Sequence, residues 1–129
     1  LPHTSIDAQT IVLGDSLGEM AMYYSFANVA MLGGSFEPLG GQNLIEAAAC
    51  ACPVVMGPHT FNFTEAAASA EKEGAAFRAV NMLSGAEMSL AMATEAKALA
   101  HASENAQRFA RQHGGATQRT VAAVREFCL

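Results

Sequence analysis

Three polar, glycine-rich segments are the parts of the chain best suited to ligand chemistry. They cover residues 14–19, 33–43 and 57–63, and each follows a short apolar run. Glycines let a ligand approach the backbone closely and leave N–H groups accessible. A helix beginning after Asn43 would add free N–H groups at the same place, which suits an anion such as a phosphate. A single glycine pair can equally well just end a strand, but three such segments favour a nucleotide or sugar site.

Two carboxylates beside these segments could bind sugar hydroxyl groups. Glu46 would lie in the first helical turn, where an ionised acceptor suits the two hydroxyl donors of a ribose. It could instead close a capping box with Asn43. Spacing alone favours the cap, because Glu65 occupies the same position relative to Asn62 with no comparable loop. Glu19 has the same ambiguity.

Other reactive side chains do not form a recognisable catalytic set. His59, at the end of an apolar run, is the one histidine in a plausible site, and Glu37 is typical of a solvated loop acid. The sequence has no P-loop, no G-x-G-x-x-G and no Ser/His/Asp or Cys/His order. Cys50, Cys52 and Cys128 lack a second pair of zinc ligands, so we interpret them as reduced thiols. We therefore expect no catalytic residue, no metal site and no cofactor in this chain.

The segments are positioned by an alternation of short strands and helices. Apolar runs at residues 11–13, 29–32, 54–56 and 77–80 are too short for helices and predict buried strands. Ala-rich segments of helical length separate them. Strands joined by crossover helices run parallel, and their loops gather at one edge of the sheet. The sequence predicts an α/β fold with a parallel sheet and flanking helices.

Helix starts are indicated by an N-cap residue followed three positions later by Glu. The four predicted pairs are Ser16 with Glu19, Asn43 with Glu46, Asn62 with Glu65, and Ser84 with Glu87. Residues 84–129 predict two or more amphipathic helices, broken near Gly114 and Gly115, that cover one face of the sheet.

Length and charge limit the possible partners. The chain has 129 residues and a net charge of -5, and residues 1–71 contain no Lys or Arg. We expect one domain over residues 1–129 and no binding of nucleic acid, which needs clustered cations. A membrane-spanning helix is also not expected. The chain begins without Met or a signal peptide, so we interpret it as an N-terminally truncated piece of a longer protein.

Three motifs resemble the C-terminal half of the 3-deoxy-D-manno-octulosonic acid (Kdo) transferase family. They are VLGDSLGE (12–19), GGSFEPLGGQNLIEAAA (33–49) and PVVMGPHTFNF (53–63). The resemblance covers essentially the whole chain, with specific motifs in the first 63 residues. It implies a GT-B glycosyltransferase with two Rossmann-like domains, of which this one holds the donor CMP-Kdo. The reaction implied is metal-free transfer of Kdo to lipid A precursor, in lipopolysaccharide biosynthesis at the cytoplasmic face of the bacterial inner membrane.

The resemblance also implies which residues contact CMP: Leu17, Gly18, Glu19, Asn43, Leu44, Ile45 and Glu46. On this basis Glu46 both caps the helix and binds the ribose. Gln42 stands where family members often have His, and Leu44 where they often have Pro. The general base, the acceptor site and the membrane attachment are expected in the missing N-terminal part, so this piece is expected to be inactive alone. The alternatives are a GT-B transferase for another nucleotide sugar, such as a UDP-sugar, and a non-catalytic nucleotide-binding or interaction domain.

Overall fold

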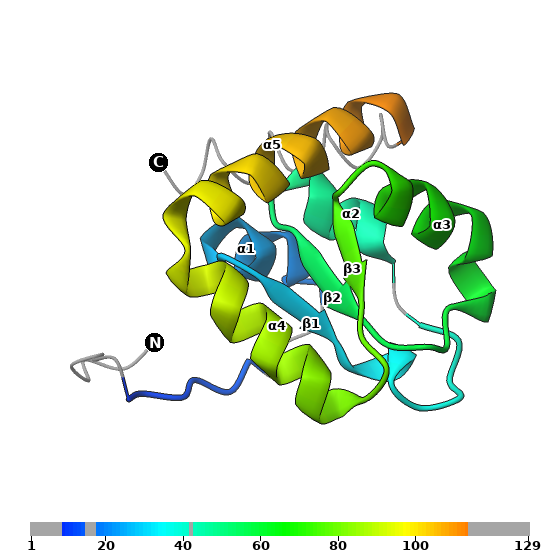
Figure 1. Ribbon diagram of the computed structural model, residues 1–129, viewed down its shortest axis with the longest axis horizontal. Helices are drawn as coiled ribbons and strands as arrows, with labels where there is room; N and C mark the ends of the chain where they lie inside the picture. The colour runs from blue at the N-terminus through cyan, green and yellow to red at the C-terminus, as the bar shows by residue number, and fades with distance from the viewer. Residues whose placement is uncertain (1–8, 15–17, 42, 114–129) are drawn as a thin grey trace.

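The computed structural model describes residues 9–14, 18–41 and 43–113 of the chain. Short strands alternate with helices along most of this length, as predicted (Figure 1). The elements are, in order, α1 Met20–Phe26, β1 Ala30–Leu32, the 3-10 helix η1 Gly33–Ser35, α2 Leu44–Ala49, β2 Val54–Met56, the 3-10 helix η2 Phe61–Phe63, α3 Thr64–Lys72, β3 Ala76–Arg78, α4 Met82–Thr94 and α5 Ala96–His113.

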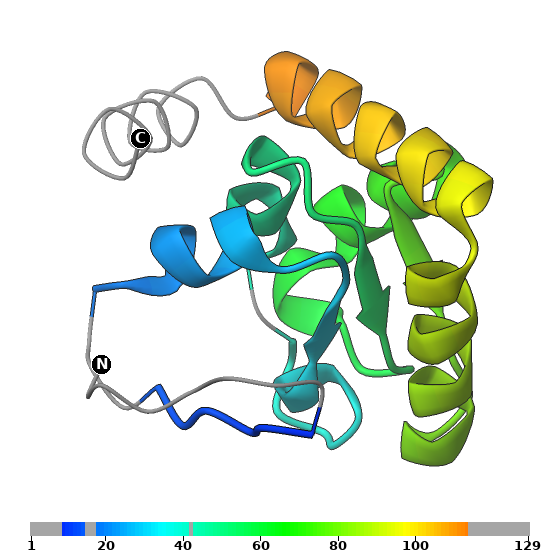
Figure 2. The same cartoon turned by 90° about the vertical axis from the view of Figure 1, so that its left-hand side faces the viewer.

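The three strands form a parallel sheet in the order β1-β2-β3. Val55 in the central strand pairs with Met31 on one side and Phe77 on the other. All three residues of β2 are buried, as expected for a parallel strand covered on both faces. Helices α1, α2 and α3 lie on one side of the sheet and α4 on the other, while α5 crosses the end where the strands begin (Figures 1 and 2). The carboxyl ends of all three strands therefore lie at the edge of the sheet opposite α5.

The strand predicted at residues 11–13 is wrong. These residues are not in a strand, and the side chains of Ile11 and Leu13 are 95% and 85% exposed. A strand is stabilised by ladder hydrogen bonds and by burial. The run has neither in the structure, so its apolar composition alone does not make it a strand. The other three runs correspond to β1, β2 and β3.

The predicted Asn62–Glu65 capping box is also wrong. Helix α3 begins at Thr64, and its N-cap residue, Phe63, makes no side-chain cap. The Asn62 amide instead donates to the carbonyl oxygen of Leu39 at 3.4 Å. The asparagine therefore joins two loops and does not start a helix.

Helix α4 begins one turn earlier than the Ser84–Glu87 pair predicts. Asn81 is the N-cap residue: its Oδ1 accepts from the Ser84 N–H at 2.8 Å, and Ser84 Oγ accepts from the Asn81 N–H at 3.2 Å. Ser84 thus closes a capping box from its third position. Serine is common as an N-cap residue, so the sequence pattern placed the cap at Ser84. The structure places it three residues earlier, at Asn81.

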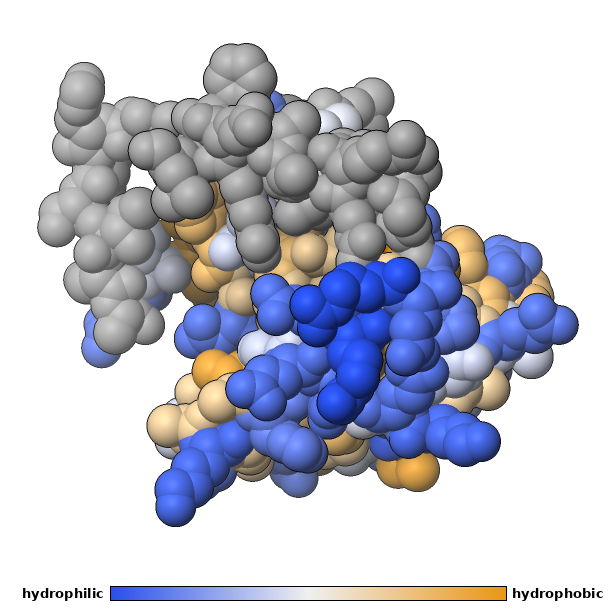
Figure 3. All heavy atoms as spheres, turned by 90° about the horizontal axis from the view of Figure 1, so that it is seen from above, coloured by the Kyte–Doolittle hydropathy of each residue, from blue (hydrophilic) through white to orange (hydrophobic). Residues whose placement is uncertain are grey.

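The C-terminal helices partly match the prediction. The first break lies at Glu95, between α4 and α5, whereas Gly114 and Gly115 are outside the described residues. Helix α4 contacts β1 and β2 and so covers one face of the sheet. The outer surface of α5 is mostly hydrophilic (Figure 3). Helix α5 packs chiefly on α2. Its buried residues are Ala102, Asn105, Ala106, Phe109 and Ala110.

Within the described residues, no helix is both long enough and apolar enough to cross a membrane. The longest, α5, has 18 residues but carries charged side chains along its length. The core of the sheet and helices is instead built from many alanines, which allow helix and sheet backbones to approach closely.

Replacing Gly74 by Ala is expected to destabilise the fold by about 1–3 kcal/mol. Gly74 joins α3 to β3 with φ +76°, and a Cβ there would come within 2.6 Å of the Asn105 amide nitrogen. Urea unfolding measures the effect. Gly33→Ala is the control, because a Cβ at Gly33 meets no atom within 4 Å. Equal losses in both variants would contradict the assignment of strain to Gly74.

Candidate nucleotide-binding site

The loops after β1 and β2 are joined at the carboxyl edge of the sheet by a buried serine. Ser35 is 0% exposed. Its Oγ donates to the Leu32 carbonyl oxygen at 2.5 Å and accepts from the Gly57 N–H at 2.8 Å. Its own carbonyl oxygen accepts from the His59 N–H at 2.9 Å. These contacts place the glycine-rich segment after β1 directly beside the one after β2.

Gly40 and Gly41 continue this joined surface toward α2. Their φ angles are +95° and +88°, which favour glycine. The Gly41 N–H donates to the Gly34 carbonyl oxygen at 3.3 Å, and the Gly40 carbonyl oxygen accepts from the Asn62 N–H at 3.1 Å. A Cβ at Gly41 would lie 3.3 Å from the His59 carbonyl oxygen. The two glycines therefore have a local conformational role and allow the two loops to pack closely.

Helix α2 begins directly beyond these glycines. The Asn43 side chain accepts from the Ile45 N–H at 3.1 Å, so the predicted cap residue is right. The predicted pairing of Asn43 with Glu46 is wrong, because the asparagine oxygen serves the second helical N–H and not the third. Glu46 is half-buried in the first turn of the helix. Its carboxylate is thus not needed to cap α2.

Leu44 and Ile45 have mainly packing roles in the structure. The Leu44 side chain is 1% exposed, and Ile45 is half-buried against the core. Because the Ile45 N–H donates to the Asn43 side chain, a backbone N–H contact with a ligand would fall to Leu44. Leu44 has a backbone N–H, which the proline often found at this position in the Kdo transferase family would lack.

The other predicted contact residues lie where α1 begins. Gly18 is exposed with φ +81°, and Glu19 is the N-cap residue of α1. The Tyr23 hydroxyl donates to Glu19 Oε2 at 3.1 Å and so helps to orient that carboxylate. Leu17 and Ser16 are outside the described residues, as is Gln42.

Buried groups connect α1 with α2 beside this site. Burial, with the neighbouring Glu46 carboxylate, raises the pKa of Tyr24 to about 12. Tyr24 therefore keeps its proton at neutral pH, and Glu46 lies close enough to α1 to influence it. Burial also raises the pKa of Cys52 to about 12, so this thiol is a weak nucleophile. Cys50 and Cys52 are buried and not bridged, as predicted, whereas Cys128 is outside the described residues.

Arg78 is a residue at this edge that the sequence reasoning missed. It ends β3, and its NH1 donates to the Gly57 carbonyl oxygen at 2.8 Å. Its NH2 donates to Thr60 Oγ1 at 3.3 Å, and its Nε lies 3.5 Å from Glu71 Oε1. A basic residue inside an otherwise apolar predicted strand was the available signal, because such a residue is rarely buried without partners.

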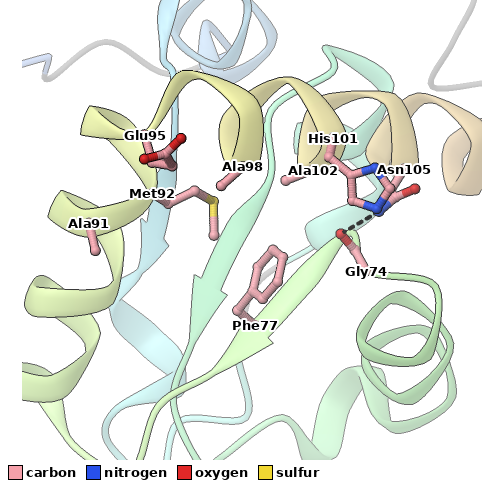
Figure 4. A pocket seen from close by; sticks show the side chains of 9 residues that line it. All are labelled: Gly74, Phe77, Ala91, Met92, Glu95, Ala98, His101, Ala102 and Asn105. Atoms are coloured by element: carbon pink, nitrogen blue, oxygen red, sulfur yellow. Dashed lines mark hydrogen bonds between the residues drawn. The ribbon is translucent and has the colours of Figure 1, made fainter.

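A separate hollow of about 630 Å³ lies at the other end of the sheet, between β3, α4 and α5. Phe77 and Met92 face into it, and the Asn105 amide donates to the Gly74 carbonyl oxygen at its edge at 3.4 Å (Figure 4). It contains none of the predicted contact residues. Among the described residues, no group of three His, Cys, Asp or Glu side chains could hold a metal ion.

Comparison with known proteins relates the chain to one enzyme family. No family model matches the sequence. The 3-deoxy-D-manno-octulosonic acid transferase of Bordetella pertussis is 47% identical over 117 residues, which cover 91% of this chain and 27% of that protein. The Haemophilus influenzae transferase of the same name is 46% identical over 55 residues, 43% of this chain and 13% of that protein. The chain is homologous to the 3-deoxy-D-manno-octulosonic acid transferases.

A solved structure supports the same relationship at the level of the fold. The C-terminal CMP-Kdo binding domain of WaaA from Acinetobacter baumannii matches with a TM-score of 0.70 and 30% identity, over 74% of this chain and 50% of that one. The predicted Rossmann-like α/β fold of the C-terminal GT-B type is therefore confirmed. The chain spans about a quarter of the length of the Bordetella transferase.

Proposed function

We propose that residues 1–129 form one donor-nucleotide-binding domain of a GT-B Kdo transferase. The observation that carries the proposal is the combination of 47% identity to a Kdo transferase with a fold like that of a CMP-Kdo binding domain. The whole enzyme would transfer Kdo from CMP-Kdo to lipid A precursor during lipopolysaccharide biosynthesis. It would act at the cytoplasmic face of the bacterial inner membrane.

The donor would occupy the edge formed by the loops after β1 and β2 and the first turns of α1 and α2. The backbone N–H groups of Asn43 and Leu44 would receive the phosphate, with Ile45 beside them, and Glu46 would accept hydrogen bonds from the ribose hydroxyls. Leu17, Gly18 and Glu19 would complete the CMP contacts. Two features support this assignment: Glu46 is half-buried but not required for capping, and two positive-φ glycines come shortly before α2.

In the proposed reaction, the acceptor oxygen forms a bond to the anomeric carbon of Kdo as the bond to the CMP phosphate oxygen breaks. A base takes the proton of the acceptor hydroxyl, and CMP leaves with the bonding electrons. The base, the acceptor site and the membrane attachment are assigned to the part of the transferase that this chain does not cover. This chain would stabilise the charge of the leaving phosphate, without a metal ion or cofactor.

Nucleotide titrations of the full-length protein, monitored by NMR, test the proposal. We expect the dissociation constant of CMP to be at least about tenfold lower than that of UDP. This corresponds to a difference in binding free energy of about 1.4 kcal/mol. Preference for UDP would indicate a transferase for a UDP-sugar. Absence of binding by either nucleotide would contradict a donor-binding role and favour an interaction domain.

A further inference from the structure

Arg78 joins β3 to the loop that follows β2. Two of its guanidinium nitrogens bind this loop, one at the Gly57 carbonyl oxygen (2.8 Å) and one at Thr60 Oγ1 (3.3 Å). Bonds from a charged donor are among the stronger hydrogen bonds in proteins, and the planar guanidinium fixes their relative direction. The third guanidinium nitrogen, Nε, forms an ion pair with the Glu71 carboxylate at 3.5 Å. Arg78 thus fixes the loop at two points three residues apart.

The loop after β2 also packs against Ser35 and Gly41, in the segment that precedes α2. Its His59 N–H donates to the Ser35 carbonyl oxygen at 2.9 Å. The His59 carbonyl oxygen is the atom closest to a Cβ built on Gly41, at 3.3 Å, so the backbones of the two loops are in near contact. Gly41 is two positions before Asn43, the N-cap residue of α2. A displacement of the His59 segment would therefore be transmitted to the beginning of α2.

We propose that Arg78 is a positioning residue that holds the loop after β2 against Gly41 and so fixes the start of α2 for donor binding. The inference rests on the proposed function for its ligand, CMP. It assigns Arg78 no direct contact with the nucleotide. The Glu71 ion pair is partly exposed and contributes little, whereas the two bonds to the loop carry the effect.

Arg78→Met in the full-length protein tests this role, because methionine keeps the length and apolar stem but donates no hydrogen bond. We expect the CMP dissociation constant to rise about tenfold, the amount that corresponds to losing one well-formed interaction. The KM for the donor should rise with little change in kcat, since ground-state and transition-state binding both depend on the loop. Arg78→Lys should recover part of the affinity, because an ammonium can still reach one acceptor.

Further variants separate positioning from general stability. Arg111→Met removes an exposed arginine from α5 and should leave CMP affinity unchanged. Thr60→Val removes one of the two loop acceptors with little change of shape and should weaken CMP binding about threefold, less than loss of both bonds. It also provides the affinity test if Arg78→Met does not fold. Unchanged CMP affinity in folded Arg78→Met, or in Thr60→Val when only that variant folds, would overturn the proposal.

Amide hydrogen exchange tests the positioning role of Arg78 without any nucleotide. If Arg78 holds the loop, the His59 and Gly41 N–H groups should exchange faster in Arg78→Met, while those in β1 remain unchanged. Failure of the parent protein to bind CMP would contradict the proposed function alone. Unchanged exchange at His59 and Gly41 would contradict the positioning role, whichever nucleotide binds.

Discussion

A Glu46→Ala variant of the full-length protein should bind CMP about 10- to 100-fold more weakly than the parent, the loss typical of hydrogen bonds to a charged group. The carboxylate has two acceptor oxygens, which match the two ribose hydroxyl donors. Folding should be little affected, because Asn43 caps α2 through the Ile45 N–H without help from Glu46. NMR titration with CMP measures both the affinity and the residues that respond.

Glu65→Ala is the matched control for this prediction. Glu65 also lies in the first turn of its helix, but it is exposed on α3 and outside the proposed contact set. Its removal should leave CMP affinity unchanged while altering the net charge by the same amount. If Glu46→Ala kept the parent affinity and chemical shifts, the ribose assignment would be wrong. Equal weakening by both variants would indicate a general charge effect.

Phe109→Ala is expected to have the largest effect on stability, with a loss of about 3–5 kcal/mol. Phe109 is 0% exposed on the inner face of α5, and its ring stacks on His113 with ring centroids 4.5 Å apart. The small residues around it cannot expand to fill the space. Since whole domains are stable by only about 5–15 kcal/mol, the variant should be partly unfolded at moderate urea concentrations.

Urea unfolding followed by circular dichroism measures this loss. Gln107→Ala is the control on the same helix, because Gln107 is exposed and alanine favours helix. It should change the free energy of unfolding by less than about 0.5 kcal/mol. A small effect of Phe109→Ala would show that α5 is not part of the main core.

Much of the fold could be predicted from local sequence. The runs that contain Val54, Met31 and Phe77 are apolar enough to be buried and too short for helices, and they form the three parallel strands. Glycines after the first two strands gave the location of the candidate edge. The order of the motifs from residue 12 to 63 was sufficient to indicate the transferase family, which the relatives then supported.

The failures occurred where a residue had several possible partners. Asn62 fits a cap by spacing, but it binds Leu39 from another loop. Asn43 caps its helix through Ile45, so spacing identified the residue but not its partner. The run at residues 11–13 is apolar, yet it is exposed and unpaired in the structure. Spacing along the chain cannot rank such contacts, because their energies depend on which segments lie nearby.

The sequence by itself determined the number and order of the three glycine-rich segments that form the candidate ligand surface. Only the tertiary structure decided how they are held: Ser35 joins the segment 33–43 to the segment 57–63, and Arg78 fixes the segment 57–63 from β3. Gly57 and Arg78 are 21 residues apart in sequence, and their contact exists because parallel pairing brings the ends of β2 and β3 to the same edge. Residue types thus specified a possible ligand surface, whereas long-range hydrogen bonds determined its shape.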